Sequence, residues 1–253
     1  MKASEPEEQI DIAFGLTEGF IADLGKTKVA GDDAGYTLVG TYVQSPLRWA
    51  ISTGGKRDDI TDVEGLKGTK VGVSRIGSGS YVMSFVLADE KGWMESGKDT
   101  FSVVPLGKFA DLRAGVNNGQ ADWFMWDHTT TQKFWNNGEL KRLGEIYTPW
   151  PSWTIAARGR VPQEELEAVM GKVNEGVRHY GENEREVVEH ITGTMHYSER
   201  DCREWMKTVQ FSEDVVGVDP AVVDRTAEVL RKTGVLAEGS GGSDWMVSIL
   251  RGA

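Results

Sequence analysis

Cysteine is nearly absent from this sequence, because only one of its 253 residues, Cys202, is a cysteine. A single thiol excludes an internal disulfide framework and any metal or iron–sulfur site built from several cysteines. We interpret Cys202 as a small, half-buried side chain on a helix rather than a nucleophile, since no helper histidine is evident. The four histidines show neither HxxxH nor HExxH spacing. The sequence therefore predicts no metal site and no cofactor.

Basic residues are scarce as well: 28 lysines and arginines stand against 39 acidic residues, for a net charge of −11. Nucleic-acid-binding proteins usually carry a basic face, so we expect no nucleic-acid partner. No stretch is long and apolar enough to span a membrane. The first residues, MKASEPEEQ, are polar and acidic, and we expect no secretory signal and a cytoplasmic location. The oligomeric state is left open, a homodimer included.

Short apolar runs alternate with helical patterns, which is typical of an α/β protein with a mostly parallel sheet. The expected strands are 9–15, 36–43, 48–53, 70–74, 101–107, 121–127, 140–147 and 152–159. The expected helices are 16–25 after an entering loop, 81–93, 109–119, 128–138, 162–181, 183–193, 198–211 and 219–236. The short SPL turn predicts that 36–43 and 48–53 pair as antiparallel neighbours.

Helix starts are indicated at Ser198 and at Asp219, where a proline follows at the first helical position.

Two segments of the sequence also resemble each other. EEQIDIAFGLTEGF and NGQADWFMWDHTT both run from a glutamine through an aspartate and an apolar strand to an acid near a threonine. Two related lobes, each with a strand that ends at a shared cleft, would explain this internal similarity, and chance is the alternative.

The stretch SRIGSGSYV, 74–82, follows an expected strand and leads into an expected helix. Backbone N–H groups at a helix start are unsatisfied and favour an anion, and Ser78, Ser80 and Arg75 would add donors and positive charge. It matches neither GxxxxGK[ST] nor GxGxxG, which disfavours nucleotide hydrolysis and dinucleotide binding. The alternative is an ordinary helix cap by Ser78 or Ser80.

Several segments together resemble type II periplasmic-binding-protein folds, in the branch of aliphatic-sulfonate and nitrate receptors and fungal thiamine-pyrimidine synthases. GLKGTKVGVSRIGSGSYVMSFVLADEKGW is similar to that family's linker, strand, Gly/Ser loop and first helix of the second lobe. ADWFMWDHTTTQKF and IDIAFGLTEGF resemble strands that end at the cleft, and RWAIST and SWTIAARG resemble the crossover strands. The pattern covers 8–238 in order and most resembles a largely fungal intracellular subgroup.

The resemblance implies a two-lobed α/β fold with mixed, mostly parallel sheets and a helical C-terminal region. The first lobe would be discontinuous, 1–54 and 150–253, and the second, 65–147, would be inserted into it. The lobes would close about crossovers near 54–68 and 146–153. Family members begin with a strand, a helix and a second strand before the equivalent of QIDIAFG. We therefore expect the first lobe to be N-terminally truncated.

Candidate ligand contacts follow from the same alignment of motifs. Thr17 and Glu18 would face the ligand from the first lobe, with Glu18 accepting from an amine or amidine. Trp126 would offer a stacking face and Asp127 a second acceptor. Arg48 is either a cleft cation or a surface charge. The full predicted set is Thr17, Glu18, Arg48, Arg75, Ser78, Gly79, Ser80, Tyr81, Trp126, Asp127, Trp150 and Trp153.

These residues favour binding over catalysis, because no nucleophile–base pair is visible in the cleft motifs. We expect a small polar ligand, either pyrimidine-like or anionic, held between two closing lobes. The alternative is a divergent enzyme of thiamine-pyrimidine precursor synthesis. Such enzymes carry a cysteine-rich iron site, which one cysteine cannot build. A LysR-like effector lobe shares the fold, but no helix-turn-helix precedes it here.

Overall fold

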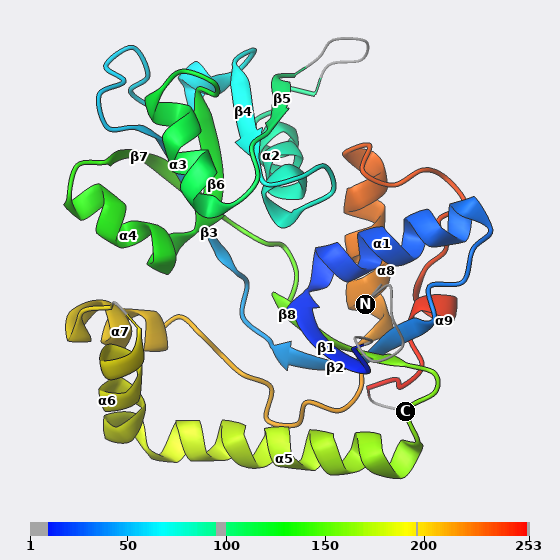
Figure 1. Cartoon of the computed structure of the whole chain (residues 1–253). Helices are drawn as coiled ribbons and strands as arrows, with labels where there is room; N and C mark the ends of the chain where they lie inside the picture. Colours follow the sequence, from blue (N-terminus) through cyan, green and yellow to red (C-terminus); the bar gives the residue numbers. More distant parts are fainter. Residues whose placement is uncertain (1–9, 95–99, 196, 252–253) are drawn as a thin grey trace. The chain divides into compact units, whose positions relative to one another are not determined.

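The computed structural model describes residues 10–94, 100–195 and 197–251. The chain divides into two compact units: the first combines Met1–Pro46 with Pro149–Ala253, and the second is Leu47–Thr148. Each unit has its own sheet (Figure 1). In the described part of the chain, no helix is both long and apolar enough to cross a membrane.

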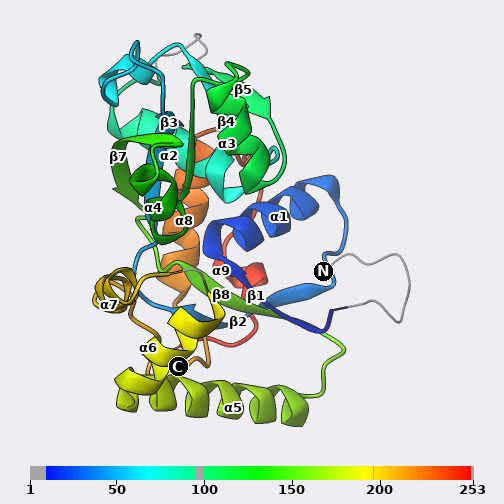
Figure 2. The same cartoon turned by 60° about the vertical axis from the view of Figure 1, so that its left-hand side comes forward.

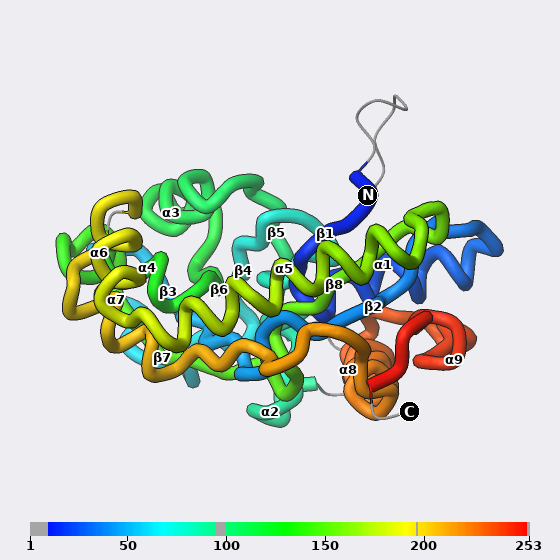
Figure 3. The backbone as a smooth tube through the Cα atoms, turned by 90° about the horizontal axis from the view of Figure 1, so that it is seen from below, coloured from blue at the N-terminus to red at the C-terminus, as the bar shows by residue number. Residues whose placement is uncertain are grey.

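The first unit is built on a three-stranded antiparallel sheet. Its strands are β1 (Ile12–Leu16), β8 (Trp153–Arg158) and β2 (Tyr36–Val43), with β8 in the middle and antiparallel to both neighbours. Helix α5 (Gln163–Glu182) runs along one face, where Leu166 and Met170 join Val39 and Ile155 in a buried core (Figure 3). Helix α1 (Thr17–Ala30) packs against α8 (Pro220–Lys232) on the other side of the sheet (Figure 1).

The remaining helices of this unit are α6 (Glu184–Thr194), α7 (Glu199–Met206) and the short α9 (Ser243–Met246). Both predicted helix starts are confirmed. The Ser198 hydroxyl caps α7 by accepting from the N–H of Asp201 at 3.1 Å, and Asp219 caps α8 with proline at its first position. Cys202 lies on α7, as expected, but it is fully buried rather than half-buried.

The second unit is a five-stranded mixed sheet in the order β5-β4-β6-β3-β7, surrounded by helices (Figure 2). Its elements in chain order are β3 (Arg48–Gly54), a 3-10 turn (Glu64–Leu66), β4 (Lys70–Val73), α2 (Gly79–Glu90), β5 (Ser102–Pro105), α3 (Phe109–Asn117), β6 (Trp123–Asp127), α4 (His128–Asn136) and β7 (Leu140–Tyr147). Strand β4 is parallel to β5 and β6, whereas β3 is antiparallel to β6 and β7.

The predicted pairing of the strands at 36–43 and 48–53 is wrong. Strands β2 and β3 were expected to pair, but they belong to different sheets, and β3 lies in the second unit although the sequence analysis assigned it to the first lobe. The SPL stretch does not form a hairpin, because Ser45 bonds to Ser152 and Gln210 instead. The sheets are mixed, but four of the six described pairings are antiparallel. The sheets are therefore less parallel than the sequence predicts, because the chain enters β3 and β8 directly, without a crossover helix.

Candidate functional site

The edge of the second unit's sheet where β4 and β6 end has the geometry of a ligand site. These two parallel strands are neighbours, and their connections lead to opposite sides of β4: α2 leads on to β5, and α3 leads back across to β6. Open α/β sheets bind ligands at such a switch point, beyond the carboxyl ends of the strands. The loop after β4 ends at Ser78, Ser80 follows in the first turn of α2, and β6 ends at Asp127.

The Gly/Ser loop after β4 is both a helix cap and a candidate anion site. Ser78 caps α2, since its hydroxyl accepts from the N–H of Tyr81 at 3.3 Å and donates to the carbonyl of Arg75 at 2.7 Å. Ser80 Oγ accepts from the N–H of Ser74 at 3.1 Å and lies 3.0 Å from Ser78 Oγ. Both hydroxyls are therefore engaged within this segment, and their use as ligand donors stays a prediction.

The backbone N–H groups of Gly79 and Ser80 are the donors that the loop leaves available. They occupy the first two positions of α2, where a helix offers no acceptor, and none of the described hydrogen bonds uses them. Gly77 takes a positive φ of 79°, which turns the chain into the helix. Arg75 is exposed and enters none of the described ion pairs. An anion at this helix start remains a prediction that the backbone geometry supports.

Tyr81, also in the predicted set, has a structural role. Its ring is half-buried and packs on Phe85 with 4.9 Å between ring centroids, and its N–H is bonded to Ser78. The contact continues from Phe85 to Phe101 within the unit's core. Tyr81 therefore contributes to the packing of α2, and its contact with a ligand stays a prediction.

The cap on α2 can be tested by stability. We expect Ser78→Ala to lower the free energy of unfolding by about 1 kcal/mol, the usual cost of losing a serine helix cap. Ser102→Ala, at an exposed position in β5, is the matched control and should change little. Urea unfolding followed by fluorescence measures both. Equal effects of the two substitutions would show that the Ser78 hydroxyl is dispensable.

Asp127 and Trp126 end β6 and point to opposite faces of the sheet, as neighbours in a strand do. Asp127 caps α4 by accepting from the N–H of Thr130 at 2.8 Å. Burial raises the pKa of Asp127, and hydrogen bonds from Thr130 and Thr129 offset part of the increase. Trp126 stacks on Phe109, with centroids 5.0 Å apart and planes 14° apart. One face of its indole is therefore occupied by Phe109, and stacking on a ligand stays a prediction.

Glu18 is the most unusual polar residue of the first unit. Helix α1 begins at Thr17, directly after β1 and without the expected loop, which places Glu18 in its first turn. Its side chain is fully buried, and Oε2 accepts from the indole Nε1 of Trp150 at 2.9 Å. Oε1 has no hydrogen-bond partner among the described residues. A buried carboxyl oxygen without a partner is costly, which makes Oε1 of Glu18 a candidate for contact with a bound molecule.

Burial raises the pKa of Glu18 from 4.5 to about 7, although its own backbone N–H and the Trp150 indole offset part of the increase. At neutral pH the carboxyl group is therefore present in both protonation states. The ionised form accepts a hydrogen bond at Oε1, and the protonated form can donate one. Titratable groups shifted in this way by desolvation are concentrated at functional sites.

The residues around Glu18 fix its position. Thr17 donates from its N–H to the carbonyl of Ser152 and from its hydroxyl to the carbonyl of Pro151, and its ligand role stays a prediction. Trp150 is buried against Glu18, whereas Trp153 begins β8, is half-buried and stays a predicted ligand contact. Thr154, which the sequence analysis missed, is fully buried, and its hydroxyl has no partner among the described residues. It lies opposite Gly15 in the β1–β8 register.

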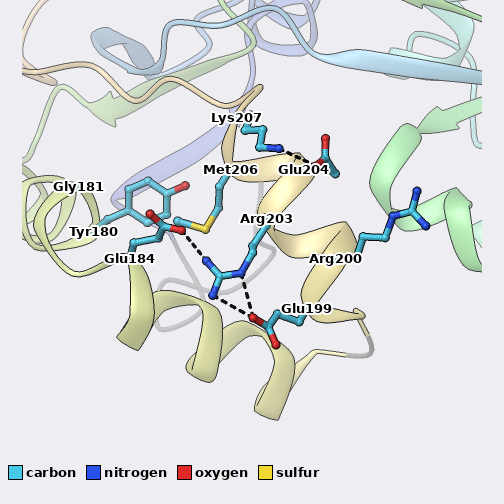
Figure 4. A pocket seen from close by; sticks show the side chains of 9 residues that line it. All are labelled: Tyr180, Gly181, Glu184, Glu199, Arg200, Arg203, Glu204, Met206 and Lys207. Atoms are coloured by element: carbon cyan, nitrogen blue, oxygen red, sulfur yellow. Dashed lines mark hydrogen bonds and ion pairs between the residues drawn. The ribbon is translucent and has the colours of Figure 1, made fainter.

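Three surface pockets of the first unit do not coincide with the predicted residues. The largest, about 740 Å³, is lined by the end of α5, the start of α6 and α7 (Figure 4). Most of its charged side chains pair with one another, since Arg203 bonds Glu199 and Glu184, and Lys207 bonds Glu204. The other two, about 310 and 670 Å³, also lack predicted site residues. Within the described ranges, no cluster of three or more His, Cys, Asp or Glu residues could hold a metal ion.

Comparisons with known proteins agree with this architecture. A family profile described as Ca3427-like PBP matches residues 49–146. The structure of the conserved Candida albicans CA3427 gene product, described as defining a new family with the generic periplasmic-binding-protein fold, is 39% identical with a TM-score of 0.83. The match covers 97% of this chain and 81% of that one. None of the curated proteins compared matches this chain.

Two more distant structures share the fold alone. The alkanesulfonate-binding protein SsuA of Xanthomonas axonopodis pv. citri, bound to MOPS, is 14% identical with a TM-score of 0.74, over 94% of this chain and 80% of that one. The periplasmic aliphatic sulphonate-binding protein SsuA of Escherichia coli is 15% identical with a TM-score of 0.65, over 92% and 78%. Given its likeness to the Candida albicans protein, the chain belongs to the Ca3427-like family of proteins with the periplasmic-binding-protein fold.

Proposed function

We propose that this protein binds a small polar molecule rather than catalysing a reaction on it, and that Glu18 is the main polar anchor. The observation that carries the proposal is the fully buried Glu18 carboxyl group, whose Oε1 has no partner among the described residues. Membership of a family with a binding-protein fold supports a ligand-binding role. The predicted closure of two lobes on the ligand, the cytoplasmic location and the homodimer stay predictions.

The chemistry of the two strand–helix junctions suggests the ligand class. Oε1 of Glu18 would accept from an N–H donor, such as an amine, an amidine or the amino edge of a pyrimidine. The free N–H groups of Gly79 and Ser80 suit an anionic or carbonyl oxygen. We therefore propose a ligand that carries an N–H donor, an anionic group or both. Sulfonates are included because SsuA proteins of the same fold bind them.

A thermal-shift panel of aminopyrimidines, sulfonates, dicarboxylates and amino acids tests this proposal. A ligand at about 100 times its Kd should stabilise the protein by roughly 2.7 kcal/mol, which raises Tm by several degrees. Glu18→Ala should abolish the shift of any N–H-bearing ligand, and Glu164→Ala, at an exposed position in α5, should leave it intact. An N–H-bearing hit that survives Glu18→Ala, or a well-folded protein that responds to no compound, would contradict the proposal.

A further inference from the structure

Two guanidinium groups converge on a single carboxylate in the second unit. Oε2 of Glu145 accepts from Arg48 Nε at 3.0 Å and Arg48 Nη2 at 2.6 Å. The same oxygen accepts from Arg142 Nη2 at 2.5 Å. His128 Nε2 lies 3.7 Å from it. Three basic side chains from β3, β7 and α4 therefore surround one acid.

The charges in this cluster do not balance. Arg48 and Arg142 carry two positive charges against the one negative charge of Glu145, and neither arginine forms an ion pair with another acid in the described part of the chain. The two arginines hold the pKa of Glu145 below its usual range despite its partial burial, so the group is ionised at neutral pH. Both arginines bond the same oxygen, and the remaining N–H groups of the two guanidiniums have no described acceptor. One positive charge of the cluster is therefore not neutralised by Glu145, and several guanidinium N–H groups can donate to another acceptor.

The cluster is rigid on one side and open to solvent on the other. Trp135 supports it from α4, with its ring 5.0 Å from the His128 ring and 5.4 Å from the Arg142 guanidinium. The Trp135 indole is itself fixed by a 3.0 Å hydrogen bond to Ser52. The side chains of Arg48 and Arg142 are 31% and 46% exposed. A solute can therefore reach guanidiniums that are already oriented.

We propose that Arg48 and Arg142 form a binding site for a small oxyanion, which is a carboxylate, sulfonate or phosphate group. Guanidinium groups are suited to this task because their planar donors match oxyanion geometry. An exposed structural ion pair would need only one arginine and would add little stability. The site goes beyond the proposed function, since it requires neither Glu18 nor the start of α2. It would give Arg48 a binding role, whereas the choice between a cleft cation and a surface charge stays a prediction.

Trp135 provides a local signal for the test. The protein is labelled with 5-fluorotryptophan, and the Trp135 resonance in its ¹⁹F spectrum is assigned from Trp135→Phe. Inorganic phosphate, methanesulfonate and acetate are titrated separately, with potassium chloride at matched ionic strength as the control. We expect a saturable shift of the Trp135 resonance with at least one oxyanion, and the relative affinities identify which group the site prefers. A shift that chloride reproduces equally would overturn the proposal.

Two substitutions in the cluster should change the oxyanion affinity in opposite directions. Arg142→Gln should weaken oxyanion binding about tenfold, as expected for the loss of a charge-assisted hydrogen bond. Glu145→Gln should strengthen it by about the same factor, because it removes the competing negative charge. Arg185→Gln, in an exposed ion pair on α6, is the charge-matched control and should have no effect. Weaker binding in Glu145→Gln, or unchanged binding in Arg142→Gln, would refute the site. Glu18→Gln should leave this titration unchanged, which separates it from the proposed function.

Discussion

Glu18→Gln is expected to stabilise the folded protein by up to about 3 kcal/mol at pH 8 and to have little effect at pH 4. The reason is that burial raises the pKa of Glu18 from 4.5 to about 7 in the folded state. Between these two values the folded protein binds more protons at this site than the unfolded chain does. The Glu18 carboxyl group therefore makes its full contribution to the free energy of unfolding below pH 4.5. This contribution is lost as the pH rises through about 7. Glutamine removes the ionisation and keeps an oxygen that can accept from Trp150.

Urea unfolding at pH 4, 6 and 8 measures the expected trend. The difference in free energy of unfolding between Glu18→Gln and the parent protein should grow with pH and level off above about pH 7. Glu164→Gln, at an exposed position, is the control for the loss of one surface charge. A difference that is constant with pH, or that is largest at pH 4, would show that Glu18 is not a desolvated acid.

Gly40→Ala is expected to destabilise the protein by about 3 kcal/mol or more, at the upper end of the range for overpacking in a core. A Cβ atom at this position of β2 would lie 2.2 Å from the carbonyl oxygen of Val215 and 2.9 Å from the Met170 side chain. The conflict with Val215 involves backbone that cannot move freely, because the Thr41 N–H is bonded to that same oxygen.

Gly171→Ala is the matched control for this substitution. Gly171 lies in α5, and a Cβ there would meet nothing within 4 Å. Alanine should therefore stabilise the helix by about 0.5–1 kcal/mol. Thermal unfolding of the two variants measures both effects. A neutral Gly40→Ala would contradict the close approach of the Val215 segment to β2.

The hydrophobic pattern of short segments was enough to predict most helices and strands. Strands β2 and β7 have the bounds expected from sequence, 36–43 and 140–147, because their apolar runs end at polar or turn residues. The pairing of β2 was not predictable in this way, since its partner β8 is more than a hundred residues away in the chain. A turn between two strands does not show that they pair when the chain passes from one unit to the other there.

The same limit applies to the candidate sites. Glu18 was identified from its place after a strand, but the hydrogen bond to Trp150 spans 132 residues, and no local pattern indicates it. The ion pair between Arg48 and Glu145 spans 97 residues and was missed for the same reason. The Ser78 motif predicted both a cap and an anion site. The hydrogen bonds of the folded chain show that the Ser78 hydroxyl is used within the loop.

The central claim is that Glu18 contacts the ligand, and proton exchange on binding tests it most directly. Isothermal titration calorimetry at pH 7, in buffers of different ionisation enthalpy, gives the number of protons exchanged with the strongest stabiliser of the thermal-shift panel. For a ligand that donates an N–H group, the parent protein should release roughly half a proton, because binding favours the ionised carboxyl. Glu18→Gln should bind more weakly and exchange none. Equal affinity and equal proton exchange in the two proteins would contradict the account.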